Sequence, residues 1–486
     1  MSDVLAGLEP RSVWGHFSEI ARIPRPSKRE QRIARWVRSV AEGHGFEVRS
    51  DAVGNLVIGV PATAGREDAP VVVLQGHLDM VCEKNKNVEH DFTEDPIRPR
   101  VDGDWVSATG TTLGSDNGIG VAAALACATD PAVAHGPLEL LFTIDEETGL
   151  TGAKRLEGHL LRGRTLLNLD SEEDGVLFVG CAGGADTHLS FATPRRRASA
   201  GSVAHTVEVG GLRGGHSGLN IHENRGNALK ILARLLDRAS DSGVPFELSS
   251  ISGGSAHNAI PREARAVLRL PKGGDARFGE VLAALGSELT SELAGIDDGL
   301  VIRLAPADSA DEILEQEHRD RLIALLLALP HGVLGMSPAL PGLVETSSNL
   351  ATVTTDGGAT TIVTSSRSSV APTQTAVLAS IRAIGRLAGA EIETHDGYPG
   401  WKPNMASPVL AVVRQVYREV WKGEPKVTAI HAGLECGLLS EKVPGIDMVS
   451  FGPQIEGAHS PEERVGISSV ARFWSALKLT LDRLST

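Results

Sequence analysis

Short, continuous apolar runs alternate with amphipathic stretches over the first 185 residues. The runs resemble strands buried on both faces and predict strands at Asn55–Val60, Val71–Gln75, Leu138–Ile144 and Leu166–Leu169. Ser27-Lys28-Arg29-Glu30 matches a capping box and predicts a helix to Gly43 or Gly45, and Asn117–Thr129 predicts a helix of small residues. Strands that alternate with helices predict an α/β domain with a mixed sheet and helices on both faces.

The pattern changes near residue 186, where apolar and polar positions begin to alternate. This alternation predicts half-exposed strands at Ala204–Val209 and Ala264–Leu270, and two more at Thr346–Thr354 and Ala359–Ser368, joined at the turn Asp356-Gly357-Gly358. Helices are predicted from about Asn224 to Ser240, at Gly279–Leu293 and at Ile313–Leu329. The mixture predicts a separate α+β domain of ordinary size.

Buried-strand runs return after about residue 387, at Val427–Ile430 and Asp447–Ser450, with helices at Val409–Val420 and Ser468–Leu484. The C-terminal segment is therefore expected to complete the first domain. We predict one domain from residues 1–185 and 387–486, interrupted by an inserted domain of residues 186–386.

Composition narrows the class of protein. The chain has 486 residues with 47 basic and 61 acidic side chains, a net charge of −14, which argues against a partner that is nucleic acid or an anionic membrane surface. The longest run of small apolar residues, Val121–Ala128, is far shorter than the roughly 20 residues that span a bilayer. Four scattered cysteines do not form a disulfide scaffold, and the N-terminal sequence does not match a signal peptide, so we expect a cytoplasmic protein.

Acidic and histidine side chains occur at five predicted strand ends or in the loops that follow them, where α/β sheets place ligand sites. His77 and Asp79 are two residues apart and share a face, so Asp79 could fix the tautomer of a metal-binding His77. Alone, this pair is better explained as a surface histidine and an aspartate that caps the next loop.

The other four positions also have ordinary explanations. Asp116, in a Gly-rich turn before a helix, could be a helix cap, and Asp170 could start a turn. The pair Glu146 and Glu147 could be a solvated surface, and His459 a solvated loop residue. However, neighbouring residues at a strand end point in different directions, so one glutamate could bind metal while the other acts as a general base.

Together these residues offer two imidazoles and three carboxylates, with two further acids to orient a ligand and move a proton. Mixed nitrogen and oxygen ligands suit zinc, manganese or cobalt, and a bridging carboxylate suits two metal ions. The joint pattern therefore predicts a metal centre more strongly than any single residue does.

The strings VVLQGHLDMVCEKN, GTTLGSDNGIG, TIDEETGLTGAK, LLNLDSEEDG, HAGLECG and FGPQIEGAHSPEERV resemble the M20 metallopeptidase family, and within it the aminoacyl-histidine (Xaa-His) dipeptidase branch. The resemblance covers nearly the whole chain in the same order. It implies a di-metal catalytic domain interrupted by a lid domain, with two divalent ions, zinc above all and manganese or cobalt as alternatives. It also implies a dipeptide substrate.

The resemblance assigns roles to the matching positions. Asp116 would bridge the two metal ions, His77 and Asp170 would complete one site, and Glu147 and His459 the other. Asp79 would orient His77, and Glu146 would be the general base that accepts a proton from water.

The inserted domain carries its own matching motifs. His216 in Gly214-Gly215-His216-Ser217-Gly218 resembles a lid histidine that polarises the scissile carbonyl, often from the partner subunit, which implies a homodimer through the lid. Asn258 and Arg367 resemble lid residues that contact substrate; a guanidinium would suit the terminal carboxylate of a dipeptide. His216 could instead be a turn residue and Arg367 part of a surface ion pair, and Glu435 could bind substrate or fix its loop.

Two other functions remain open. An N-acyl-amino-acid amidohydrolase or a tripeptidase would use the same metal centre with a different lid and pocket. A catalytically silent metal-dependent binding protein would keep the fold, although it would have no need of Glu146.

Overall fold

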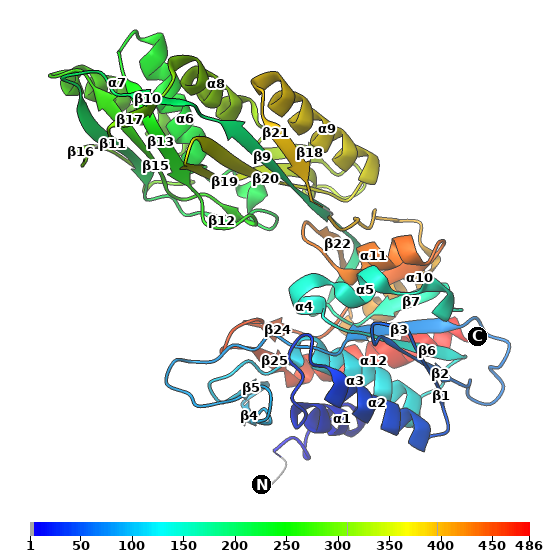
Figure 1. Ribbon diagram of the computed structural model, residues 1–486. Helices are drawn as coiled ribbons and strands as arrows, with labels where there is room; N and C mark the ends of the chain where they lie inside the picture. Colours follow the sequence, from blue (N-terminus) through cyan, green and yellow to red (C-terminus); the bar gives the residue numbers. More distant parts are fainter. Residues whose placement is uncertain (1–3, 309, 396) are drawn as a thin grey trace. The chain divides into compact units, whose positions relative to one another are not determined.

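The computed structural model describes residues 4–308, 310–395 and 397–486, which form two compact units (Figure 1). The first unit contains the described residues up to Cys181, together with Trp401–Ala429 and Leu434–Thr486. The second contains the described residues of Ala182–Gly400, together with Ile430–Gly433. Among the described residues, no helix combines the length and the apolar character that a membrane span requires.

The first unit is built on an eight-stranded mixed sheet. Its strand order is β1 (Glu47–Ser50), β2 (Leu56–Val60), β6 (Leu138–Thr143), β3 (Val72–His77), β7 (Thr165–Asn168), β23 (Asp447–Ser450), β8 (Val176–Cys181) and β22 (Lys426–Ile430). Strand β3 lies parallel to both β6 and β7, and every residue of β3 and β6 is buried. The predicted mixed sheet is confirmed, because its apolar runs are the buried central strands.

Helices cover both faces of this sheet, as predicted. Successive residues of a strand point to opposite faces. On one face, a Cβ at Gly76 would collide with Asn117 of α3 (Ser115–Thr129), so glycine permits this close approach. On the other face, Gln75 donates a hydrogen bond of 2.6 Å to Glu435, the first residue of α11 (Glu435–Lys442). The carboxyl end of β3 thus lies between two helices.

The remaining elements of the first unit surround this sheet. The longer helices are α1 (Arg11–Ala21), α2 (Gln31–Gly43), α10 (Pro408–Trp421) and α12 (Ile467–Leu484), and the short ones are α4 (Glu146–Gly149), α5 (Thr151–Arg155) and the 3-10 turn Gly158–Leu160. A small second sheet has the order β24 (Ile455–Glu456), β25 (Arg464–Gly466), β5 (Trp105–Ala108) and β4 (Pro99–Asp102).

The second unit consists of two βαββαβ halves, one nested inside the other. The inner half is β11 (Val203–Gly210), α6 (Ala228–Asp241), β13 (Glu247–Gly253), β15 (Ala264–Leu270), α7 (Asp275–Glu292) and β16 (Val301–Pro306). The outer half is β9 (Gly183–Ala192), α8 (Gln316–Ala328), β19 (Val344–Asp356), β20 (Ala359–Ser368), α9 (Ala371–Ala388) and β21 (Glu391–Thr394). Each half has the strand order 4-1-3-2, which is that of the ferredoxin-like motif.

The two halves join edge to edge through antiparallel pairing of β13 with β19, which makes one continuous sheet. Helices α6 to α9 lie along one face of it (Figure 1), and a single apolar core contains residues from all four helices and from both halves. Short strands complete the unit: β10 (Arg195–Arg197) pairs with β17 (Glu312–Leu314), β12 (Gly215–His216) with β14 (Ala259–Ile260), and β18 (Gly332–Met336) with β19. The α+β character is confirmed, as is the hairpin at Asp356-Gly357-Gly358.

Three predicted helix starts are wrong. Ser27 does not cap a helix: its hydroxyl donates to Asp79 at 2.8 Å, and α2 begins only at Gln31. Residues 312–314 form strand β17, so the predicted helix at Ile313 begins at Gln316. Helix α6 begins at Ala228 rather than Asn224, because Asn227 caps it by accepting the N–H groups of Leu229 and Lys230.

Candidate functional site

His77 is the last residue of β3 and is 1% exposed. Its Nδ1 lies 3.4 Å from Oδ1 of the buried Asp79. Asp79 also accepts the backbone N–H groups of Glu146 at 3.1 Å and Glu147 at 3.2 Å. Burial raises the pKa of Asp79, but hydrogen bonds from His77 and Ser27 outweigh it and lower the pKa to about 2. Asp79 therefore stays ionised and ties the histidine to the acidic turn, which begins with Glu146 and Glu147.

Asp116 lies between two histidines. Its Oδ1 is 3.1 Å from Nε2 of His77, and its Oδ2 is 3.2 Å from Nε2 of His459. The backbone of Asp116 departs from helical geometry (φ −79°, ψ 113°) although the residue lies in the first turn of α3. One buried carboxylate thus presents a different oxygen to each imidazole.

Two groups of potential ligands share this aspartate. His77, Asp116 and Asp170 form one, and Asp116, Glu147 and His459 form the other; within each, the ligand atoms lie within 4.8 Å of one another. His77 Nε2 is 3.4 Å from Asp170, and His459 Nε2 is 3.1 Å from Glu147.

The donor set fits divalent metal ions. Imidazole nitrogens combined with carboxylate oxygens suit zinc, manganese or cobalt. Oε1 of Glu147 is buried and has no hydrogen-bond partner, which a bound cation would supply. These residues could therefore hold metal ions, as predicted.

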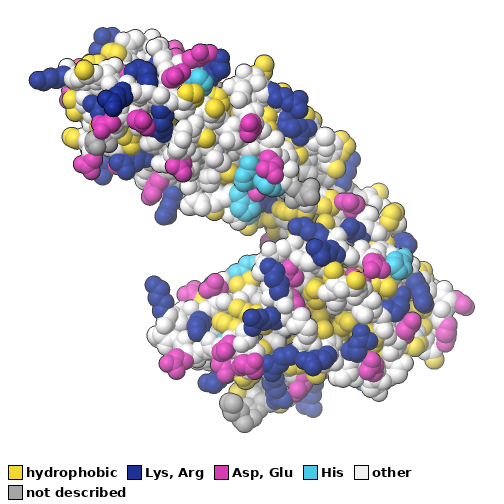
Figure 2. Space-filling view, in the orientation of Figure 1, with side chains coloured by type: hydrophobic (Ala, Val, Ile, Leu, Met, Phe, Trp, Pro, Cys, Tyr) yellow, Lys and Arg dark blue, Asp and Glu magenta, His cyan; other side chains and the backbone are white. Residues whose placement is uncertain are grey.

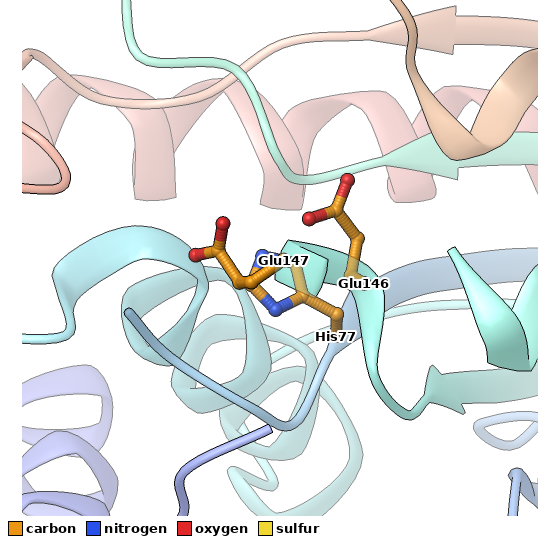
Figure 3. Close-up of side chains that lie close together, drawn as sticks. All are labelled: His77, Glu146 and Glu147. Atoms are coloured by element: carbon orange, nitrogen blue, oxygen red, sulfur yellow. The ribbon is translucent and has the colours of Figure 1, made fainter. Parts of the chain in front are cut away.

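The two glutamates that start α4 point apart, on either side of the His77 ring (Figure 3). Asp145, which precedes them, has a left-handed backbone (φ 49°), so the chain turns sharply as it leaves β6. Desolvation, together with the nearby Asp170, Glu435 and Glu147 carboxylates, raises the pKa of Glu146 well above its usual value. A carboxylate with a raised pKa beside a metal group is suited to proton transfer.

Glu435 is fully buried on the same face of β3 as His77. One of its oxygens accepts hydrogen bonds of 2.6 Å from Gln75 and from Thr143, and its other oxygen has no hydrogen-bond partner. Burial raises its pKa to about 7. These contacts fix the start of α11 against β3 and β6.

In the second unit, His216 is held in one tautomer. Its Nδ1 accepts the backbone N–H groups of Gly218 at 3.2 Å and Leu219 at 3.0 Å. The ring proton therefore sits on Nε2. Burial, together with Arg367 and His257, lowers the pKa of His216 to about 4, so at neutral pH it is an uncharged donor.

Arg367 lies close to this loop, since a Cβ at Gly218 would be 3.3 Å from its Nε. The guanidinium is 7% exposed and donates to the Tyr398 hydroxyl at 2.8 Å, while its Nε has no hydrogen-bond partner. Arg367 is buried and, among the described residues, has no acidic partner in an ion pair. Asn258 is exposed, and its backbone carbonyl accepts the N–H of Ser217 at 2.8 Å, next to His216. The structure thus brings the three predicted lid residues into one region.

Histidine side chains gather on one part of the surface of the second unit (Figure 2). Arg367 pairs with Gly184 of β9, so it shares a face of the sheet with Asp186 and His188, opposite the helix-covered core. His188 packs against His395 with ring centroids 4.3 Å apart, and His257 pairs with Asp186 at 2.7 Å. Arg367, Asp186 and His188 therefore place polar side chains on the face of β9 and β20 away from the helices.

Several residues near the sites were not predicted, among them Tyr398, His431, Arg25 and Glu463. Tyr398 and His431 lie near Arg367, and His431 shares a 2.7 Å hydrogen bond with Ser347. Arg25 and Glu463 hold the turn before Asp116. Of these, His431 and Glu463 fall inside the quoted motifs, whereas no local pattern marks Arg25 or Tyr398.

The chain is similar to known peptidases in sequence and in fold. The model of a family described as peptidase family M20/M25/M40 matches residues 73–483. The cytosol non-specific dipeptidase of Escherichia coli (strain K12) is 42% identical over 473 residues, 97% of each chain. The crystal structure of aminoacylhistidine dipeptidase from Vibrio alginolyticus has a TM-score of 0.94 at 42% identity and covers 99% of this chain and 98% of its own. The aminopeptidase PepT from Bacillus cereus, with a TM-score of 0.58 at 16% identity over 99% of this chain and all of its own, shares the fold.

Proposed function

Because this chain belongs to peptidase family M20/M25/M40, as its motifs predict, we propose that it hydrolyses the peptide bond of unblocked dipeptides, Xaa-His dipeptides included. The observation that carries the proposal is Asp116, whose two oxygens face His77 and His459 at 3.1 and 3.2 Å. The E. coli and V. alginolyticus relatives, a cytosol non-specific dipeptidase and an aminoacylhistidine dipeptidase, support the substrate class and a cytoplasmic location.

The proposed metal ligands are the members of the two groups that share Asp116. His77 and Asp170 would hold one ion and Glu147 and His459 the other, with Asp116 between them; zinc is the proposed ion, and manganese or cobalt would also suit this donor set. When bound, two such ions would polarise the scissile carbonyl and make a water more acidic. The nearby residues perform the other steps.

Glu146 is the proposed general base. It starts the same turn as the proposed ligand Glu147 and points to the other side of the His77 ring, so its carboxylate can accept a proton from the attacking water. The same carboxyl would then return the proton to the departing amine. Asp79 orients His77 and, through the two backbone N–H groups, keeps Glu146 and Glu147 in place.

The lid residues would recognise substrate. The Nε2–H of His216 can donate to an oxygen that gains negative charge during the reaction. Arg367, buried and with an unpartnered Nε, can bind the free carboxylate of a dipeptide, with Asn258 beside it. Glu435 supports the site indirectly, because its hydrogen bond with Gln75 fixes the start of α11 against β3. The homodimer through the lid stays a prediction; His216 and Arg367 lie in the same unit of one chain.

The test is a hydrolysis panel with zinc- or manganese-loaded protein, with and without chelator. It contains glycyl-histidine, β-alanyl-histidine, leucyl-glycine, a tripeptide and an N-acetyl amino acid. We expect chelator-sensitive cleavage of the dipeptides only. Cleavage of only the acetyl compound or the tripeptide would favour the amidohydrolase or tripeptidase, and metal binding without any cleavage would favour a silent binding protein.

A further inference from the structure

A buried carboxylate from far along the chain caps the start of α3. Glu463 is 2% exposed, and its Oε2 accepts the backbone N–H groups of Leu113 at 2.7 Å and Gly114 at 2.9 Å. Its Oε1 accepts the N–H of Ser115 at 2.7 Å, the hydroxyl of Ser115 at 2.6 Å and the N–H of Asp116 at 3.3 Å. This single side chain satisfies every donor of the turn that presents Asp116.

This contact explains why Asp116 is available. The first N–H groups of a helix need acceptors, and an aspartate near the start of the helix is a common one. The residue before α3, Gly114, makes no side-chain cap. Because Glu463 accepts those N–H groups instead, both oxygens of Asp116 remain free to face His77 and His459.

The same short loop carries His459. Glu463 donates its N–H to Ser460 at 3.0 Å, and Ser460 donates to Gly457 at 3.1 Å, so the loop from Gly457 to Glu463 is closed by its own hydrogen bonds. His459 has a left-handed backbone (φ 63°) within it. One loop therefore supplies an imidazole and, four residues later, anchors the turn of the aspartate that this imidazole faces.

Arg25 holds the opposite side of that turn. It is 3% exposed, and it donates to the carbonyls of Leu78 at 3.0 Å and Asp79 at 2.6 Å, and to the carbonyl of Gly114. Glycine makes room for it: a Cβ at Gly114 would lie 2.5 Å from its Nη2. Arg25 thus ties the end of β3, which carries His77, to the turn that carries Asp116.

We propose that Glu463 and Arg25 are positioning residues that set the relative placement of the two metal sites by fixing Asp116 between His77 and His459. The inference rests on the proposed function, in that it requires the dinuclear centre. His77 and Asp170 are attached to strands β3 and β7, whereas His459 depends on the loop that Glu463 anchors. Loss of Glu463 should therefore weaken chiefly the site of Asp116, Glu147 and His459.

The test is direct metal binding to the full-length, metal-depleted chain, measured by titration with Zn²⁺ against a competing chelator. Glu463→Gln keeps the size of the side chain but turns an NH2 group toward backbone donors. We expect the wild type to bind two ions. Because Asp116 belongs to both sites, E463Q should bind the first ion slightly more weakly and the second more weakly by roughly 10- to 100-fold.

Glu139→Gln is the matched control. Glu139 is a carboxylate of the same unit, 3% exposed, that accepts the N–H groups of Arg162 at 2.8 Å and Gly163 at 3.0 Å, at the other end of β6 from the acidic turn. E139Q should bind both ions as the wild type does. Arg25→Lys keeps the charge but loses the two guanidinium nitrogens that donate to the three carbonyls, so it should weaken the binding of both ions.

Ser115→Ala covers the case in which E463Q does not fold. It removes only the 2.6 Å hydroxyl bond to Glu463 and should weaken the second ion in the same direction by a smaller factor. If E463Q, or S115A where E463Q does not fold, bound both ions with wild-type affinity, Glu463 would be a helix cap without a role in positioning Asp116. If R25K bound both ions with wild-type affinity, Arg25 would not be a positioning residue. A wild-type chain that binds fewer than two ions would overturn the dinuclear centre itself.

Discussion

Glu146 and Glu147 are neighbours in sequence but face different surroundings. Glu147 lies 3.1 Å from His459, whereas desolvation and nearby carboxylates raise the pKa of Glu146. We predict that Glu146→Ala lowers kcat by at least 10²- to 10⁴-fold, because proton transfer is lost. The metal content of the variant, measured by elemental analysis, should remain that of the wild type.

Glu147→Ala is the comparison for this prediction. It removes a proposed ligand and should lower both activity and the amount of metal bound. If Glu146→Ala also lost its metal, Glu146 would belong with the ligands and another group would have to accept the proton.

Arg367 differs from a surface arginine because it is buried and donates a hydrogen bond of 2.8 Å to the Tyr398 hydroxyl. We predict that Arg367→Lys raises KM for dipeptides by about 10- to 100-fold, since a charge-assisted bidentate pair contributes about 1.5–3 kcal/mol. A dipeptide amide has no terminal carboxylate and should be a poor substrate for both proteins. The ratio of kcat/KM for the free acid to that for the amide should therefore fall in R367K.

Tyr398→Phe controls for the packing around Arg367. It removes only the hydroxyl and should lower that ratio less than R367K does. If R367K reduced cleavage of the acid and the amide equally, Arg367 would support the lid without reading the substrate's carboxylate.

At the scale of single elements, Asn227 and Ser407 are N-cap residues whose own side chains accept helix N–H groups, one in each unit. Asn227 caps α6 through two backbone N–H groups and also donates to the carbonyl of Leu350 at 2.9 Å, whereas Ser407 caps α10 through Leu410 alone. We predict that Asn227→Ala costs about 2 kcal/mol, a cap plus a buried hydrogen bond, and Ser407→Ala about 1 kcal/mol.

Hydrogen exchange measures where these losses occur. Amide protection should fall in α6 for N227A and in α10 for S407A, with the other unit unchanged in each case. Equal losses of protection across both units in either variant would mean that the caps act on the whole chain rather than on their own helices.

The sequence predicts elements best where one local signal dominates. The apolar runs of β3 and β6 form strands that are buried on both faces, and their continuous apolar composition predicts this burial. Ser27 failed as a helix cap because its hydroxyl binds Asp79, 52 residues away, and the sequence holds no local sign of that partner. Residues 312–314 failed as helix because they pair with β10, another long-range contact.

The candidate site was predicted in the same uneven way. Its histidines and carboxylates stand in long motifs at strand ends, and the structure brings His77, Asp116, Asp170, Glu147 and His459 together in two groups. The residues that position these ligands could not be predicted from motif spacing. Arg25 acts through carbonyls of three separate residues, and Glu463 reaches a turn 350 residues earlier, so both depend on the complete fold.

At the scale of the whole molecule, the second unit repeats one βαββαβ plan twice. The inner half carries His216 in the loop between β11 and α6, and the outer half carries Arg367 on β20. The antiparallel pairing of β13 with β19 joins the equivalent edges of the halves. Two separate copies of such a half could meet in the same way, but here one chain contains both.

This arrangement leads to a prediction about whether a partner subunit contributes to the site of each chain. Because His216 and Arg367 lie near each other within one chain, a partner subunit is not needed to assemble the lid residues. We predict that activity per chain stays constant from micromolar to nanomolar protein, whether or not light scattering detects a homodimer at the higher concentration. Mixing the inactive variants Glu146→Ala and His216→Ala provides a second measurement. If the partner's lid completed each site, mixed dimers would regain activity, since one of their two sites would have both residues intact. We expect no recovery, and a fall in activity that parallels dimer dissociation would show that the partner contributes.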